Sequence, residues 1–211
     1  METAVYTIGH STHPFERFIE LLKSHSITAI GDVRSTPYSR MNPQYNREAL
    51  REALKANGIA YVFLGVELGA RSNDPECYRD GKVQYDRLAK TALFKQGIDR
   101  VLAGADEHRI ALMCAEKDPL QCHRTILVTR NLRELGVEVR HLLSDGEIES
   151  QEQCEERLLN NLNMSSSDLF RSWDEMVRDA YRVQGDAIAY SMEQTSATEP
   201  THLRSPKDQT T

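Results

Sequence analysis

The segment LMCAEKDPLQCHR, residues 112–124, gathers side chains that could do chemistry. Cys122 is followed directly by His123 and Arg124. A neighbouring imidazole and guanidinium lower the pKa of a thiol and hold it as the nucleophilic thiolate. We therefore predict that Cys122 is a nucleophile or redox thiol, that His123 is its base or ion-pair partner, and that Arg124 binds an anion.

The same segment contains Cys114 and Glu116 at the end of its apolar run. Cys114 is a second candidate thiol, and Glu116 is a candidate acid or base. Free cysteines are also among the residues most often buried in protein cores. A packed, inert thiol is therefore the competing interpretation for both Cys114 and Cys122.

Further polar residues follow other apolar runs. Asp32 and Arg34 belong to the segment DVR, where Asp32 could serve as an acid or base and Arg34 could bind an anion. A structural ion pair between the two explains the pattern equally well. The remaining candidates for substrate binding are His10, Ser11 and Arg71. His10 could instead be a buried histidine with satisfied hydrogen bonds, and Arg71 a solvated loop residue.

Short apolar runs alternate with helical patterns over most of the chain. The runs predict strands at residues 4–10, 27–34, 59–65, 108–115 and 137–143. The spacing of apolar residues between them predicts helices at 14–25, 47–58, 87–105 and 123–135, with Gly97 as a point where the third could break. Such alternation is typical of an α/β fold, a three-layer, mostly parallel sheet of about five strands with helices on both faces. Because the carboxyl ends of parallel strands meet at one edge, we expect the candidate residues to converge there.

We divide the chain into an α/β core domain at 1–145, a helical extension at 146–190 and a disordered tail at 191–211. The extension begins with a glutamate-rich stretch, expected to be a solvated helix, and continues with a stretch whose apolar residues could dock on the core, namely Leu169, Trp173, Met176 and Tyr181. The tail is polar, contains proline and has few apolar residues, which is typical of disorder.

Composition favours a globular protein in a reducing compartment. Of the 211 residues, 39% are hydrophobic and 27% are charged, and the formal net charge is -6. This acidity argues against non-specific binding to nucleic acid, which needs a surplus of Lys and Arg. The 4 cysteines are too few for a disulfide framework, and no signal peptide or membrane-spanning run is recognisable. We expect a cytoplasmic protein without a membrane partner, and the sequence leaves its oligomeric state open.

Several motifs, taken in order, resemble a known family. YTIGHS, DVRSTPYSR, YVFLGVELGAR, CAEKDPLQCHR and GVEVRHL together resemble the bacterial family of domains of unknown function called DUF488. The resemblance implies no established reaction, but it implies the positions of interest, which are His10, Ser11, Asp32, Arg34, Arg71, Cys114, Glu116, Cys122, His123 and Arg124. Strand, cysteine, loop and helix also follow one another in rhodanese sulfurtransferases and cysteine phosphatases, but neither cysteine has their short spacing to Arg124.

Three functions are compatible with these residues. The preferred hypothesis is an enzyme that acts on a small anionic or nucleotide-like substrate at the carboxyl edge of the sheet by thiol or acid/base chemistry, without a cofactor or metal. The second is a metal-dependent, hydrolase-like site, although the spacing C-x7-C-H matches no common zinc motif. The third is a non-enzymatic nucleotide- or nucleic-acid-binding module, in which tyrosines stack on bases and arginines bind phosphates.

Overall fold

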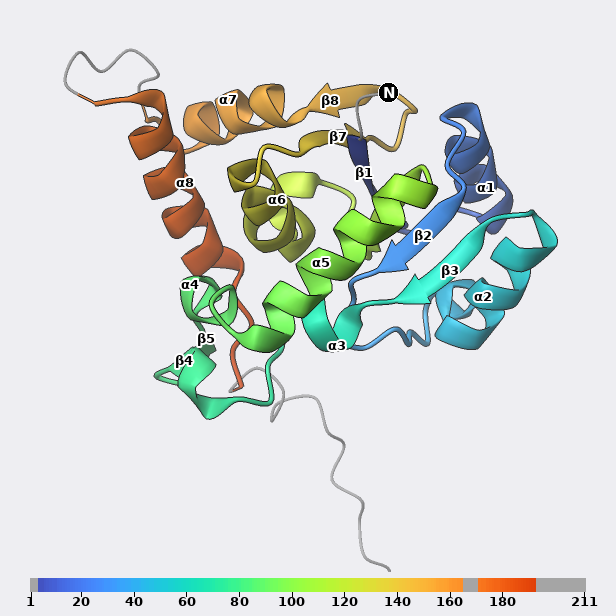
Figure 1. Ribbon diagram of the computed structural model, residues 1–211, viewed down its shortest axis with the longest axis horizontal. Coiled ribbons are helices and arrows are strands. Elements are labelled where there is room, and N and C mark those ends of the chain that lie inside the picture. The colour runs from blue at the N-terminus through green and yellow to red at the C-terminus, as the bar shows by residue number, and fades with distance from the viewer. Residues whose placement is uncertain (1–3, 165–170, 193–211) are drawn as a thin grey trace, which may run out of the picture.

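A six-stranded sheet forms the centre of the computed structural model, which describes residues 4–164 and 171–192 (Figure 1). The strands lie in the order β3-β2-β6-β1-β7-β8. Five of them run parallel, namely β1 (Ala4–Gly9), β2 (Ala29–Asp32), β3 (Ala60–Phe63), β6 (Ile110–Cys114) and β7 (Glu138–Leu142). All five coincide with predicted strands, and the predicted α/β class with a mostly parallel sheet is confirmed.

The sixth strand, β8 (Ile148–Ser150), was not predicted. It pairs antiparallel with β7 at one edge of the sheet. Its three residues, Ile-Glu-Ser, carry no alternating apolar signal and lie within the stretch assigned to the helical extension. Pairing with β7, and not local sequence, makes this segment a strand.

Helices cover both faces of the sheet, as predicted. α1 (Phe15–Ser24) and α2 (Arg47–Ala56) pack on one face, and α5 (Ala92–Glu107) packs on the other (Figure 1). The long segment between β3 and α5 holds short elements only, which are α3 (Gly65–Leu68), the hairpin of β4 (Tyr78–Arg79) and β5 (Lys82–Val83), and α4 (Tyr85–Leu88).

The side chains of β6 alternate between the two faces. Ala111 and Met113 join the apolar cluster under α1 and α2, whereas Ile110, Leu112 and Cys114 join the cluster under α5. All five residues of the strand are buried. The two-residue period of the strand therefore directs Cys114 to the α5 face.

The fourth predicted helix begins differently from the prediction. Residues Arg124–Thr129 form a π-helix, which continues as α6 (Arg130–Glu134). π-helical turns are rare, and they occur frequently at functional sites. All six residues of the turn are buried. The helix that follows the cysteine motif is thus part of the core from its first residue.

The C-terminal extension packs on the core. It contains α7 (Gln151–Asn161) and α8 (Trp173–Ile188). The buried apolar residues of these two helices join the cluster under α5, and they are Cys154, Leu158, Leu159, Met176, Val177, Ala180 and Tyr181. α7 is the glutamate-rich helix that was expected to be solvated. That expectation is wrong for one of its faces, which is buried against the core. Beyond α8 the chain reaches the β4–β5 hairpin, where the N–H of Val83 donates to O of Tyr190 at 3.0 Å.

Leu169, expected to dock, and residues 193–211 of the tail expected to be disordered lie outside the described residues. Ser191, the first residue of the predicted tail 191–211, instead forms an antiparallel bridge with Lys82 of the β4–β5 hairpin. In the part of the chain that the structure describes, no helix combines the length and the apolar character needed to cross a membrane.

Gly97 does not interrupt α5 but allows it to approach α3. A Cβ built on Gly97 would lie 2.7 Å from Cβ of Glu67 and from a methyl carbon of Leu68. A Cβ built on Gly104 of the same helix would meet only a side-chain carbon of Ile110, at 3.6 Å. The first position therefore requires glycine for packing, and the second does not.

We expect Gly97→Ala to lower the free energy of unfolding, although alanine is the better helix former by about 1 kcal/mol. Gly104→Ala, the matched control, should raise it by up to about 1 kcal/mol. Urea denaturation followed by circular dichroism measures both. A stabilised Gly97→Ala variant would contradict the close approach of α3 and α5.

Candidate active site at the carboxyl edge of the sheet

The carboxyl ends of three neighbouring strands meet at the candidate site. Gly9 of β1 lies opposite Cys114 of β6, and Asp32 of β2 lies opposite Met113. A pocket of about 310 Å³ opens at this edge. Its walls include five of the predicted site residues, namely Arg34, Arg71, Cys114, Glu116 and His123.

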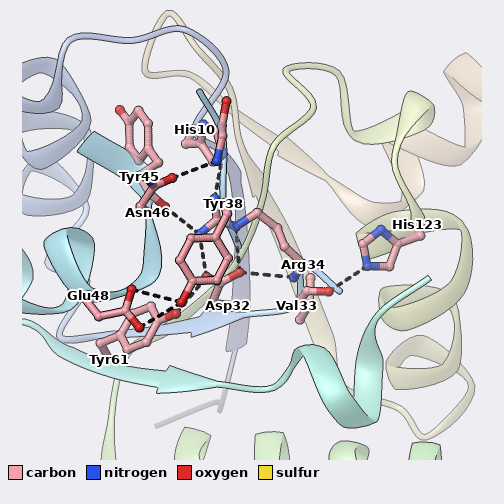
Figure 2. A network of polar contacts seen from close by, with 11 residues as sticks. His10, Asp32, Val33, Arg34, Tyr38, Tyr45, Asn46, Glu48, Tyr61 and His123 are labelled. Carbon is pink, nitrogen blue, oxygen red and sulfur yellow. Dashed lines mark hydrogen bonds and ion pairs between the residues drawn. The ribbon is translucent and has the colours of Figure 1, made fainter. Parts of the chain in front are cut away.

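Cys114, Cys122 and His123 form a buried cluster at one wall of the pocket. Nδ1 of His123 lies 3.7 Å from Sγ of Cys114 and 3.9 Å from Sγ of Cys122. Nε2 of the same ring lies 3.0 Å from O of Val33, the contact drawn in Figure 2, and donates its proton there. Nδ1 is thereby turned toward the two sulfurs. Sγ of Cys122 also lies 3.0 Å from Oε2 of Glu116.

The two thiols of the cluster differ in pKa. Burial raises the pKa of Cys114 well above its ordinary value, and Cys122 and Glu116 raise it further. Burial acts in the same direction on Cys122, but the hydrogen bond from Cys114 and the charges of Arg124 and His123 outweigh it and lower the pKa of Cys122 well below its ordinary value. Burial also opposes a charge on His123, yet its interactions with Cys122 and Glu116 raise its pKa. These directions favour the thiolate at Cys122 over the thiolate at Cys114.

The two cysteines of the cluster differ in their position relative to the pocket. Cys114 lines the pocket, whereas Cys122 is absent from its walls. Burial raises the pKa of Glu116, whose Oε2 lies 3.0 Å from Sγ of Cys122. Cys114, Glu116 and His123 are therefore the groups of the cluster that face the pocket.

Arg124 holds the loop after β6. Its guanidinium donates to the backbone carbonyls of Glu116, at 2.6 Å, and Lys117, at 3.2 Å, and the residue is only 1% exposed. Its backbone N–H donates to Sγ of Cys122 at 3.4 Å. Arg124 was predicted to bind an anion, but it lies outside the walls of the pocket and is committed to backbone groups. Its place in the structure is that of a positioning residue.

Figure 2 shows a second buried network, centred on Arg34. The guanidinium forms a bidentate ion pair with Asp32, with 2.9 Å from Nε to Oδ1 and 2.6 Å from Nη2 to Oδ2. Nη2 also donates to O of Tyr45 at 2.9 Å, and Nη1 lies 3.2 Å from Nε2 of His10. The hydroxyl of Tyr61 donates to Oδ2 of Asp32 at 2.8 Å. Asp32 and Arg34 thus form the structural ion pair that was one of the two interpretations of the DVR segment. Arg34 also lines the pocket.

His10 is a buried, neutral member of this network. Its Nδ1 donates to O of Ser11 at 2.8 Å, and its ring stacks on Tyr45 with 4.1 Å between the centroids. Burial and then the charge of Arg34 lower the pKa of His10 to about 4. Nε2 therefore accepts a hydrogen bond from Nη1 of Arg34, and the ring carries no charge near neutral pH.

Ser11 does not line the pocket that borders the thiol cluster. It adopts a left-handed backbone conformation with φ 48°. Together with His10 it lines a second pocket of about 330 Å³, which shares Arg34 and Glu116 with the first. The candidate site thus consists of two adjoining hollows along the sheet edge.

Arg71 contributes a cation from the segment after α3. Its backbone N–H donates to Oγ of Ser35 at 3.1 Å, and its guanidinium lies 4.4 Å from the centre of the Tyr190 ring. Among the ion pairs formed within the described residues, none involves Arg71. Because Tyr190 follows α8, the C-terminal extension supplies part of the pocket wall.

Three groups in the cluster are of the types that bind metals. Sγ of Cys114, Sγ of Cys122 and one ring nitrogen of His123 all lie within 4.8 Å of one another. Within residues 4–164 and 171–192 this is the one set of three His, Cys, Asp or Glu side chains close enough to share an ion. All three residues are buried.

Residues 14–131, more than half of the chain, match the family described as domain of unknown function DUF488. The chain belongs to this family. The matched region of this DUF488 protein begins just before α1 and ends in the first turn of α6, so it includes β2, β6 and the whole loop from Cys114 to Arg124. The resemblance carried by the sequence motifs is confirmed. A search of the curated proteins finds no match to the chain.

Several groups that build the site gave no signal in the sequence. The carbonyl of Val33 orients His123, the carbonyl of Tyr45 and the hydroxyl of Tyr61 complete the Asp32–Arg34 network, and Tyr190 covers Arg71. Backbone carbonyls carry no residue-specific signal. A tyrosine distant in the sequence can be placed only once the sheet order is known.

We expect Asp32→Asn to lower the free energy of unfolding by about 3 to 5 kcal/mol, because it leaves the buried Arg34 guanidinium without its counter-charge. Asp86→Asn removes the exposed partner of Arg130, paired at 3.0 Å, and should cost less than about 1 kcal/mol. Urea denaturation of both variants tests this difference. Equal, small losses would show that Asp32 does not balance a buried charge.

Proposed function

We propose that this DUF488 protein is an enzyme that acts on a small anionic or nucleotide-like substrate in the edge pocket. One observation carries the proposal. Cys114, Glu116 and His123, which can react or transfer protons, line the same pocket as the cations Arg34 and Arg71. Reactive groups and anion-binding groups in one pocket are typical of an active site.

The two arginines differ in what they can offer to a substrate. The charge of Arg34 is largely balanced by its bidentate pair with Asp32, so Arg34 offers mainly a fixed hydrogen-bond donor. The guanidinium of Arg71 lies 4.4 Å from the centre of the Tyr190 ring, and Arg71 forms none of the ion pairs within the described residues. Arg71 is therefore the principal anion-binding group, and the aromatic side chains of Tyr85 and Tyr190, which line the same pocket, suit a planar ring.

The remaining groups support acid/base or thiol chemistry. Glu116 borders both hollows and can accept or donate a proton to a substrate in either. If the thiols are free, Cys114 is the sulfur within reach of the substrate, with Nδ1 of His123 3.7 Å away to accept its proton. Cys122 and Arg124 lie outside the pocket walls, where Cys122 contacts Glu116 and Arg124 holds the loop that carries Glu116. This assignment differs from the sequence-based hypothesis, which favoured Cys122 as nucleophile.

We expect the protein to bind small anions in this pocket through Arg71. Titration with inorganic phosphate and with adenosine monophosphate, followed by calorimetry, should give saturable binding that Arg71→Ala weakens by about ten- to a hundredfold, since a charge-assisted hydrogen bond contributes about 1.5–3 kcal/mol. Tighter binding of the nucleotide would favour a nucleotide-like substrate over a simple anion.

Arg79→Ala is the matched control, because the Arg79 side chain is 73% exposed and lies outside the pocket. It should bind both probes as the wild type does. If neither probe binds, or if Arg71→Ala binds as tightly as the wild type, the anionic substrate class is wrong.

A further inference from the structure

The three ligand atoms of the Cys114, Cys122 and His123 cluster have the spacing of a tetrahedral metal centre. Zinc–sulfur bonds of about 2.3 Å and zinc–nitrogen bonds of about 2.0–2.1 Å place sulfur and nitrogen ligands about 3.6 Å apart in a tetrahedron. Nδ1 of His123 lies 3.7 Å and 3.9 Å from the two sulfurs. All three atoms lie within 4.8 Å of one another, so a single ion placed between them could contact all three.

Groups behind the cluster orient its members as they do in metal sites. Histidine ligands generally donate their other ring N–H to a carbonyl or carboxylate, which fixes the tautomer. Here Nε2 of His123 donates to O of Val33 at 3.0 Å and leaves the lone pair of Nδ1 facing both sulfurs. The backbone N–H of Arg124 donates to Sγ of Cys122 at 3.4 Å, a contact suited to a metal-bound thiolate.

The position of the cluster leaves one side open. Cys114 and His123 line the edge pocket, whereas Cys122 is buried and lies outside the pocket walls. Three protein ligands with a fourth position open to a cavity are the arrangement of catalytic zinc sites, whereas structural sites are closed by four. Two thiolates and a neutral imidazole would also leave the site with a divalent ion electrically neutral, which suits burial.

We propose that Cys114, Cys122 and His123 hold one zinc-class divalent ion whose fourth position faces the edge pocket. Thiolate and imidazole ligands select zinc and related ions over magnesium or calcium, which prefer oxygen ligands. The ion would bind a water molecule in the pocket and lower its pKa toward neutrality.

The role of this ion rests on the proposed function, which it narrows to hydrolysis of a small anionic substrate. Glu116 is not one of the three ligands. It would accept a proton from the bound water molecule while the oxygen of that water forms a bond to the electrophilic atom of the substrate. The bond to the leaving group breaks with its electron pair, and the leaving group takes the proton from Glu116. No oxidant or reductant is required.

The test is the metal content and the metal spectrum of the full-length protein. Reduced protein freed of metal with a chelator is titrated with zinc, and separately with cobalt(II) as a spectroscopic probe. We expect one ion per chain and a cobalt spectrum with sulfur-to-metal charge-transfer absorption. Cys114→Ser, Cys122→Ser and His123→Ala should each weaken zinc binding by at least about a hundredfold.

Cys77→Ser is the matched control, because Cys77 is also a free, buried cysteine but lies outside the cluster. It should bind one ion with the affinity of the wild type. Circular dichroism of each variant shows whether lost binding reflects unfolding, and the cobalt spectrum of the wild type does not depend on the variants.

Wild-type protein that binds no zinc and gives no cobalt–thiolate absorption would overturn the metal site, as would full binding by the Cys114 and Cys122 variants. In that case phosphate or nucleotide binding through Arg71 would still stand, with Cys114 as a free thiol. Loss of anion binding in protein that retains its zinc would instead overturn the proposed substrate class and leave the metal site intact.

Discussion

The buried ion pair between Asp32 and Arg34 is the interaction on which the candidate site depends. Arg34 is only 6% exposed, and a buried guanidinium is costly unless its charge and its N–H groups find partners. Arg34 finds them on separate segments, in Asp32 at the end of β2, His10 after β1, and the carbonyl of Tyr45. Because one side chain needs all three, its burial fixes how the loops after β1 and β2 lie against each other.

A second buried arginine does the same for the loop that carries the cysteine motif. Arg124 holds the carbonyls of Glu116 and Lys117, and Gly9 allows that loop to approach so closely that a Cβ would lie 1.9 Å from O of Glu116. Most of the hydrogen bonds of both arginines go to groups inside the protein. Arg71 differs from them, because it pairs with no carboxylate of the described residues and its guanidinium lies 4.4 Å from the centre of the Tyr190 ring. The pocket is thus bordered by one arginine whose charge is balanced, Arg34, and by one without an acidic partner in that part of the chain, Arg71.

The sequence predicted the five parallel strands because each is a short, largely apolar run between helical patterns, and that signal is local. It also located the candidate residues at strand ends, where the parallel arrangement makes convergence expected. The roles of individual residues were less predictable, because a role depends on where the side chain points, and residue type does not reveal that. Whether Arg124 points to a ligand or to a backbone carbonyl is decided by the π-helical turn, and nothing in the residue types of Arg124–Thr129 distinguishes that turn from an α-helix.

The spacing of the two cysteines illustrates the same limit. Spacing rules for zinc motifs apply where both ligands come from one turn or one helix, so that the separation along the chain sets the separation in space. Cys114 ends a parallel strand, and Cys122 precedes a π-helical turn, so their separation is set by the loop that Arg124 holds. The strand alternation turns Cys114 toward the α5 face, and the carbonyl of Val33 on the neighbouring chain segment turns His123 to meet it. A ligand set assembled across the sheet edge in this way leaves no fixed spacing in the sequence, although each of its members was a candidate by residue type.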